Sequence, residues 1–181
     1  ISEILTAVRF EPRGKDAIVM DSLSEIYIDG GLWSSDCTKT LHVANEQTAS
    51  SICPPNMEFL NTFENVYGCG ARGTAKKRDV KLRSIDSCVF NDEMPLPNFI
   101  KLDIHSSELP ALLGSENSLQ NCVGLLVETW NSEVHIGQGL HFQVEQFAIE
   151  HGFELYDSKC AARLSIKHKN EVCSIDRRRY I

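Results

Sequence analysis

The stretch that decides the fold is Asn98-Phe99-Ile100-Lys101-Leu102-Asp103-Ile104-His105-Ser106-Ser107-Glu108. It begins as a short apolar run, ends in a polar cluster and is preceded by two prolines. Such a run, bounded by turn residues, indicates a buried strand. In an open α/β sheet, ligands bind beyond the carboxyl ends of the strands, so Asp103 and His105 are candidate site residues. On spacing alone, an equally good alternative is that Asp103 and Ser106 merely cap the helix that follows.

Outward from this stretch, the pattern predicts strands that alternate with helices. The predicted strands are Leu5–Glu11, Glu25–Ile28, Thr38–Val43, Val80–Leu82, Phe99–Asp103, Cys122–Val127 and a closing pair, Phe153–Tyr156 and Ala161–Ile166. The predicted helices are a weak one at Lys15–Leu23, then Ser84–Phe90 with Ser84 as N-cap, Ser106–Leu113 ended by Gly114, and Gln138–His151. A loop is expected between Glu46 and Asn56, and residues 177–181 carry no clear signal. This alternation is typical of a single α/β domain with a largely parallel sheet.

Composition limits the function. The chain has 181 residues and a net charge of −7, which argues against a nucleic-acid-binding surface as the main function. Its seven cysteines are odd in number, widely spaced and without CxxC pairs, so neither a disulfide framework nor a zinc site is predicted. A reducing compartment, the cytoplasm, fits this usage best. No run approaches the roughly 18 apolar residues of a membrane span, and no signal peptide is visible.

One glycine-rich segment matches a nucleotide-binding pattern. Gly68-Cys69-Gly70-Ala71-Arg72-Gly73 has the spacing GxGxxG, which requires a strand before it and an apolar-periodic helix after it. No helix of useful length fits the residues that follow. The favoured interpretation is therefore a flexible connection, and a nicotinamide-dependent oxidoreductase is the last-ranked function.

Several motifs, taken together and in order, resemble one family. Phe99-Ile100-Lys101-Leu102-Asp103, followed by Glu108-Leu109-Pro110-Ala111-Leu112-Leu113-Gly114, resembles the "IKIDVEGAE…L.GA" signature of FkbM-type S-adenosylmethionine-dependent methyltransferases. Ala7–Pro12 resembles that family's "V.AFEP" second strand, and Leu82–Asp86 resembles its "v.tLD.l" segment. Gly31-Leu32-Trp33 resembles its "aLG" turn, and Phe142–Tyr156 resembles its closing helix and strand. Each match is weak alone, and together they cover nearly the whole chain.

The resemblance implies a Rossmann-like methyltransferase sheet, mostly parallel, with helices on both faces and an antiparallel closing strand. It also implies methyl transfer from S-adenosylmethionine to a hydroxyl of a sugar or other small metabolite. Glu11 would bind the cofactor's ribose hydroxyls, because a carboxylate accepts strong hydrogen bonds. The turn with Asp29 and Gly31 would pass the adenine, where glycine permits close backbone approach. Asp103 would lie near the methionine part or the transfer point.

Two departures from the family qualify this expectation. The family's glycine-rich first loop, "DVGAN.G", is absent, so we expect a chain that is N-terminally incomplete and a sheet with a gap where the first strand would lie in its middle. The family's "EG" is replaced by His105-Ser106. Because an unperturbed histidine has a pKa near neutrality, His105 is a candidate general base, or else a simple surface replacement. As a lone histidine without an identified partner, it supports no metal site.

Two functions from different classes follow. The leading hypothesis is an S-adenosylmethionine-dependent O-methyltransferase with Asp103 and His105 at the catalytic point. The alternative is a methyltransferase-like module that has lost catalysis and serves a structural or interaction role. Trp130, His135 and His141 follow the last long buried strand, where this family would shape its acceptor pocket, although ordinary packing is the favoured role for Trp130. Glu108 matches the family, and an acidic residue in a first helical turn is also favoured by the helix dipole.

Overall fold

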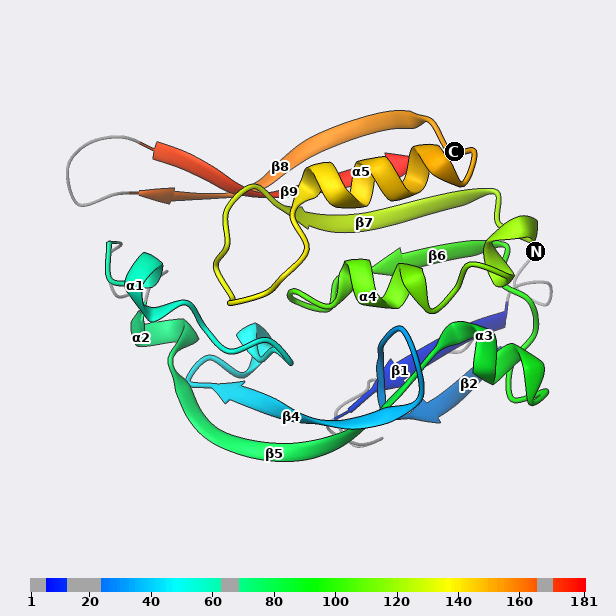
Figure 1. Ribbon diagram of the computed structural model, residues 1–181, viewed down its shortest axis with the longest axis horizontal. Coiled ribbons are helices and arrows are strands. Elements are labelled where there is room, and N and C mark those ends of the chain that lie inside the picture. The colour runs from blue at the N-terminus through cyan, green and yellow to red at the C-terminus, as the bar shows by residue number, and fades with distance from the viewer. Residues whose placement is uncertain (1–5, 13–23, 63–68, 166–170) are drawn as a thin grey trace.

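The computed structural model describes residues 6–12, 24–62, 69–165 and 171–181. Its strands form three sheets of mixed direction, and its helices flank them, which confirms an α/β chain (Figure 1). The predicted helix at residues 15–23 lies outside the described residues. In the part of the chain that is described, no helix has the length and apolar character needed to cross a bilayer.

The first sheet has two parallel strands, β1 (Thr6–Glu11) and β2 (Ser24–Asp29). Both strands were predicted, and the first ends at Glu11 as expected. The register pairs Glu11 with Asp29, so these two acidic residues stand side by side at the carboxyl ends of their strands. Most side chains of this pair of strands are half-buried rather than buried.

The second sheet has the order β3-β5-β4, with β3 at Gly31–Leu32, β4 at Cys37–Ala44 and β5 at Thr74–Arg83. β4 agrees with the predicted strand, whereas β5 is far longer than the three residues predicted for it. Its first half is charged and exposed, from Ala75 to Asp79, and so offers no apolar alternation to recognise. Its antiparallel pairing with β4 is what defines this half as a strand.

The third sheet contains the decisive stretch. Its order is β6-β7-β9-β8, with β6 at Phe99–Leu102, β7 at Gly124–Trp130, β8 at Leu155–Ser165 and β9 at Glu171–Tyr180. β6 and β7 are parallel, and β9 runs antiparallel to both of its neighbours. The prediction of a closing pair within residues 153–166 is wrong, because these residues form one strand, β8. Its partner β9 includes most of the tail that the sequence left unassigned.

Strand direction also departs from the expected, mostly parallel sheet. Among the described strands, β1–β2, β3–β5 and β6–β7 pair in parallel, whereas β4–β5, β7–β9 and β8–β9 pair antiparallel. The antiparallel pairings all involve β5 or β9, and neither β9 nor the charged first half of β5 has a signal in the sequence. A Rossmann-like sheet therefore remains a proposal, and the mixed α/β architecture is what is observed.

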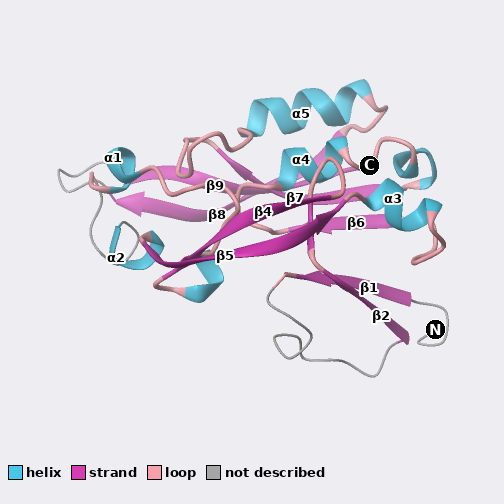
Figure 2. Cartoon of the chain, turned by 60° about the horizontal axis from the view of Figure 1, so that its bottom comes forward, coloured by secondary structure: helices cyan, strands magenta, loops and turns pink. Residues whose placement is uncertain are grey.

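The helices are short. They are α1 (Met57–Leu60), α2 (Cys69–Arg72), α3 (Ile85–Phe90), α4 (Glu108–Leu113) and α5 (His141–Glu150), with 3₁₀ turns η2 (Gln47–Ala49) and η3 (Ser118–Asn121). The predicted helices at α3, α4 and α5 are confirmed, and the Ser84 hydroxyl caps α3 by accepting the Ser87 N–H. Helices were expected on both faces of the sheet, yet α4 and α5, the described helices that cover the third sheet, share one face (Figures 1 and 2).

Gly114 ends α4 for a reason other than the one predicted. A C′ glycine with left-handed backbone was expected, but Gly114 has φ −87°. A Cβ at this position would lie 2.2 Å from the Trp33 carbonyl oxygen, so the close approach of the segment after β3 is what requires glycine.

One core cluster joins the third sheet to its helices. Leu125 and Val127 of β7, with Ala111 and Leu112 of α4, have no exposed surface. The first sheet contributes one buried residue, Ile28 of β2, and its other contacts come from partly buried residues such as Val8 and Phe10 of β1. The centre of the cluster is therefore formed by β7 and α4, and the first sheet packs against it mainly through half-buried side chains.

A cavity lies between β1 and β6. It has a volume of about 390 Å³ and is lined by Thr6, Val8 and Phe10 from β1 and by Phe99, Ile100 and Lys101 from β6. On the sides that face this cavity, neither strand pairs with another strand among the described residues. The first and third sheets are therefore distinct, with an open space between their edges.

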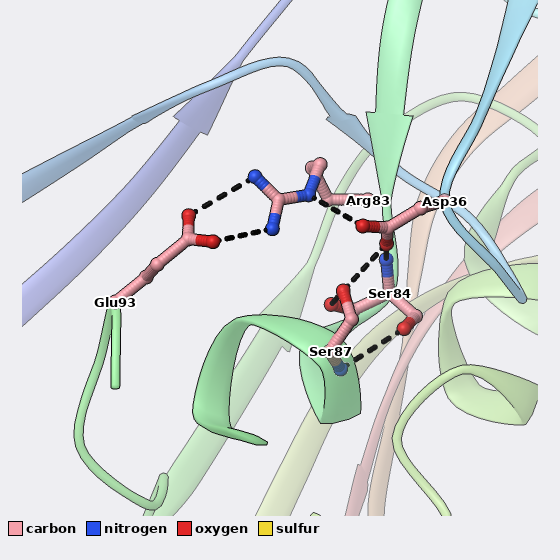
Figure 3. A network of polar contacts seen from close by, with 5 residues as sticks. All are labelled: Asp36, Arg83, Ser84, Ser87 and Glu93. Carbon is pink, nitrogen blue, oxygen red and sulfur yellow. Dashed lines mark hydrogen bonds and ion pairs between the residues drawn. The ribbon is translucent and has the colours of Figure 1, made fainter. Parts of the chain in front are cut away.

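A polar network fastens the end of β5 to α3 (Figure 3). Arg83 forms ion pairs with Glu93 and, at 2.9 Å, with Asp36, and Asp36 also accepts hydrogen bonds from the Ser84 N–H and the Ser87 hydroxyl. Burial alone would raise the pKa of Asp36, but these hydrogen bonds and the charge of Arg83 hold it below its ordinary value. The network fixes the start of α3.

Candidate functional site

A cavity of about 200 Å³ brings together residues that are far apart in the sequence. Glu11 at the end of β1, Gly31 in β3, and Asp103 and His105 after β6 all line it. Residues of the η2 region and the following loop, including Ser50 and Ser51, close its other side. Four of the five residues predicted as site residues therefore meet at one place.

Asp29, the fifth predicted residue, lies beside this cavity rather than in its lining. It is exposed at the end of β2, opposite Glu11 in the register of the two strands. The Tyr27 hydroxyl lies 3.3 Å from its Oδ1 and 3.2 Å from the Glu11 carbonyl oxygen. The two acidic residues are held as neighbours by this tyrosine.

The turn after β6 has an unusual backbone. His105 and Ser106 both have positive φ, at 52° and 86°, in the left-handed region that favours glycine. Ser106 stands where the resemblance places a glycine, so the backbone keeps a glycine-like conformation although the residue differs. Two buried contacts hold the turn: the Glu108 carboxyl accepts the Ile104 N–H at 3.0 Å, and the Ser106 hydroxyl bonds to that of Ser51.

The alternative in which Asp103 and Ser106 only cap the next helix is wrong. The N-cap of α4 is Ser107, and no side-chain hydrogen bond caps this helix. Asp103 instead lies 3.5 Å from the Lys101 ammonium and lines the cavity. The backbone of the turn is fixed by other residues, so Asp103 and His105 present their side chains at the site.

Glu108 is buried rather than an exposed first-turn acid. It is 2% exposed, and burial, together with the nearby charge of Glu128, raises its pKa to about 8. The carboxyl is therefore mainly protonated at neutral pH, and it contributes to the site as a hydrogen-bonding brace for the turn rather than as a charge that complements the helix dipole.

Glu128 is the site residue that the sequence reasoning missed. It lies in β7, is 5% exposed, and its Oε2 is 3.9 Å from the His105 Nδ1. Leu102 pairs with Val127 in parallel register, so Asp103 and Glu128 both follow directly at the same edge of the sheet. The sequence contained a signal for Glu128. Asp103 and Glu128 each follow directly after an apolar run, and parallel strands place such ends at the same edge of a sheet.

Aromatic and histidine side chains extend the site beneath this edge. The fully buried Trp130 lies between His105 and His135, with ring centroids 6.0 and 5.7 Å away. Burial first, and then the positive charge of Arg72, lowers the pKa of His135 to about 3, so this imidazole is neutral. Trp130 thus packs as favoured, and His135 is part of the same buried layer, whereas His141 lies half-buried at the start of α5.

The glycine-rich segment also reaches this region. α2 is four residues long and β5 begins two residues after it, so the helix that a dinucleotide loop requires is not formed there. Its last residue, Arg72, places the guanidinium carbon 5.4 Å from the centre of the Trp130 ring. Burial lowers the pKa of Arg72, and the nearby Glu128 charge partly offsets this. The segment therefore places the positively charged side chain of Arg72 at the site and does not form a phosphate-binding loop.

The described thiols are free. Among the cysteines whose side chains are described, Cys37, Cys53, Cys88 and Cys122 form no disulfides. Comparisons with family models, with curated proteins and with solved structures found no match to this chain.

Proposed function

We propose that the chain is an S-adenosylmethionine-dependent O-methyltransferase domain that acts on a hydroxyl of a small metabolite or sugar. The observation that carries this proposal is the meeting of Glu11, Gly31, Asp103 and His105 around one cavity. These residues come from motifs that lie far apart in the sequence, and the resemblance predicts that they meet at one cofactor site, which is why their meeting at one cavity supports the proposal.

Two further observations support it. Ser106 keeps a glycine-like φ of 86° at the position of the family's glycine. β9 runs antiparallel to both of its neighbours, as a closing antiparallel strand would. Both features agree with the fold that the resemblance implies, and both are observations separate from the lining of the cavity.

Each residue has a distinct role in this proposal. The Glu11 carboxylate would accept hydrogen bonds from the ribose hydroxyls, because charged acceptors make the stronger bonds. Asp103, across the cavity, would lie near the methionine part. The cavity of about 200 Å³ is smaller than the roughly 300–1,000 Å³ of pockets that enclose drug-sized ligands, so it would hold part of the cofactor.

S-adenosylmethionine supplies an electrophilic methyl group. Glu11 and Asp103 would hold the cofactor, and His105 would accept the proton of the acceptor hydroxyl as its oxygen takes the methyl group. Glu128, 3.9 Å from the Nδ1 of His105, would stabilise the imidazolium that results. Most of the rate gain would come from holding the two reactants in register.

The test is calorimetric titration of S-adenosylmethionine into this chain, into Glu11→Ala, and into Glu116→Ala as a matched control on an exposed carboxylate far from the cavity. We expect Glu11→Ala to weaken binding by about tenfold or more, the effect of losing a charged hydrogen bond, and Glu116→Ala to leave it unchanged. Equal affinity in all three proteins would remove Glu11 from the cofactor site.

A second candidate is a methyltransferase-like module without catalysis. The observation that favours it is the open space of about 390 Å³ between β1 and β6, since the resemblance places the first strand in the middle of the sheet. Calorimetry separates the two candidates when it includes a form carrying any residues that the gene encodes upstream. Failure of every form to bind S-adenosylmethionine would favour the silent module.

A further inference from the structure

We infer that Asp103, His105 and Glu128 form a binding site for one divalent transition-metal cation. One ligand atom from each side chain lies within 4.8 Å of the other two, and the His105 Nδ1 and Glu128 Oε2 are 3.9 Å apart. The sequence argued against a metal because His105 had no identified partner. The fold supplies two partners, from adjacent strands.

The spacing suits a metal ion. Zinc-type ions bind nitrogen and oxygen ligands at roughly 2.0–2.2 Å, so two ligand atoms of one ion lie at most about 4 Å apart. The His105–Glu128 pair is already within that limit. Asp103 completes the set by a small rotation, because its side chain is 23% exposed and its neighbour Lys101, at 59%, can turn toward solvent.

The three ligands rest on a firm frame. Asp103 and Glu128 follow Leu102 and Val127, which are paired in parallel register and almost fully buried. His105 projects from the turn that the Glu108 carboxyl and the Ser51 hydroxyl hold in place. Ligands presented by strands and a braced turn lose little freedom on binding, which favours a precise site.

The donor set indicates the class of cation. Two carboxylate oxygens and one imidazole nitrogen suit Mn²⁺, Fe²⁺, Co²⁺ or Zn²⁺, whereas Ca²⁺ prefers oxygen ligands throughout. Asp103 and His105 also line the cavity of about 200 Å³, so the remaining coordination positions would face a ligand held there. A cation at this place would polarise a bound hydroxyl or carbonyl oxygen. The inference is independent of methyl transfer.

One neighbouring charge competes with this site. Arg72 lies close enough for the Glu128 charge to raise its pKa, and so it already compensates part of that carboxylate. The carboxylates of Asp103 and Glu128 nevertheless lie close to His105, and the exposed Lys101 offsets the charge of Asp103 only at the surface. Metal binding therefore requires that Arg72 leave the Oε2 of Glu128 accessible.

The experiment is a titration of the chain with Co²⁺, followed by visible absorption and calorimetry, in a weakly coordinating buffer without S-adenosylmethionine. We expect one Co²⁺ per chain, with ligand-field bands of nitrogen and oxygen coordination and without the charge-transfer band of a thiolate. Glu128→Gln and Asp103→Asn should each weaken binding by about 100-fold, at the upper end of what metal-site partners contribute. Glu150→Gln, on an exposed carboxylate of α5, should bind like the parent chain.

The outcomes of the Co²⁺ titration either support or overturn the metal site. Absence of binding, a thiolate band, or equal affinity in Asp103→Asn and the parent chain would overturn the inference. Circular dichroism verifies that Glu128→Gln folds, and if it does not, the half-exposed Asp103→Asn still provides the test. Titration of S-adenosylmethionine into the same metal-free samples measures the proposed function separately, so either proposal can fail while the other stands.

Discussion

The two sides of the candidate cavity are built differently. On the β6–β7 side, Leu102, Leu125 and Val127 are at most 1% exposed, and Glu128 and Glu108 are buried with them. Among the described residues, the β1–β2 side has two strands, and most of their side chains are half-buried. His105, Asp103 and Glu128 thus sit on the more buried side, whereas Glu11 and Asp29, proposed to bind the cofactor, sit on the less buried one.

This difference suggests how the site would work. A two-stranded sheet is marginal by itself, so β1–β2 depends on its packing against the main core through residues such as Val8 and Phe10. A ligand that spans the cavity would add contacts to the weaker side. We therefore expect ligand binding to stabilise β1–β2 more than β6–β7, because stabilisation by a ligand follows the contacts it adds.

The largest expected effect concerns Glu108 and pH. The folded state keeps its proton up to about pH 8, whereas the free carboxyl loses it near 4.5, so the unfolded chain binds fewer protons across this interval. This contribution to the free energy of unfolding is fully present below about pH 4.5 and is lost as the pH rises toward 8, by at most about 1.4 kcal/mol per pH unit.

Glu108→Gln removes this titration and can still accept the Ile104 N–H. We expect the variant to match the parent chain in urea unfolding at about pH 5 and to exceed it at about pH 8 by a few kcal/mol. Glu116→Gln, on an exposed carboxylate, is the control. A stability difference that stays constant between the two pH values would show that Glu108 is charged in the folded state.

A matched pair of truncations compares the packing of the two sides. Val127→Ala, at a fully buried position of β7, should lower the free energy of unfolding by roughly 2–3 kcal/mol. Val8→Ala, at the half-buried position of β1, should cost less than about 1 kcal/mol. Urea unfolding measures both. Equal losses would mean that β1–β2 belongs to the core as fully as β7 does.

A smaller effect is expected at the turn that carries His105. Ser106→Gly and Ser106→Ala both lose the hydroxyl bond to Ser51, but only glycine adopts the observed φ of 86° without strain. Ser106→Gly should therefore be more stable than Ser106→Ala by about 1 kcal/mol in the same unfolding assay. If alanine were tolerated equally, the left-handed conformation would carry no strain at this position.

The smallest effect is expected at Glu93. It is exposed and pairs with Arg83 in the network beside α3. Exposed ion pairs contribute little, because solvent screens them and ordering the side chains costs entropy. Glu93→Gln should therefore leave urea unfolding almost unchanged at low and at high salt. A clear loss that disappears at high salt would assign this network a larger role in holding α3.

How much the sequence could predict depended on where the apolar residues lie. β6 and α5 were predictable because their buried residues alternate or repeat in the sequence, and β7 because it begins as a near-continuous apolar run. β9 and the first half of β5 were not, because their charged residues carry no such pattern and only pairing with a neighbour makes them strands. Asp103 and His105 were found from the sequence. Glu128 follows the apolar run of β7 as Asp103 follows that of β6, and it was missed because only the parallel pairing of these two strands brings it near His105.

The open space between β1 and β6 also affects how the backbone amides of β6 exchange with solvent. In a parallel pair, alternate residues of a strand direct their N–H and C=O groups to one neighbour, and the intervening residues direct theirs to the opposite side. Among the described residues, β6 is paired with β7 on one side only. Hydrogen–deuterium exchange should consequently show a two-residue alternation of fast and slow amides along β6, and uniform protection along β7, which has a partner on each side.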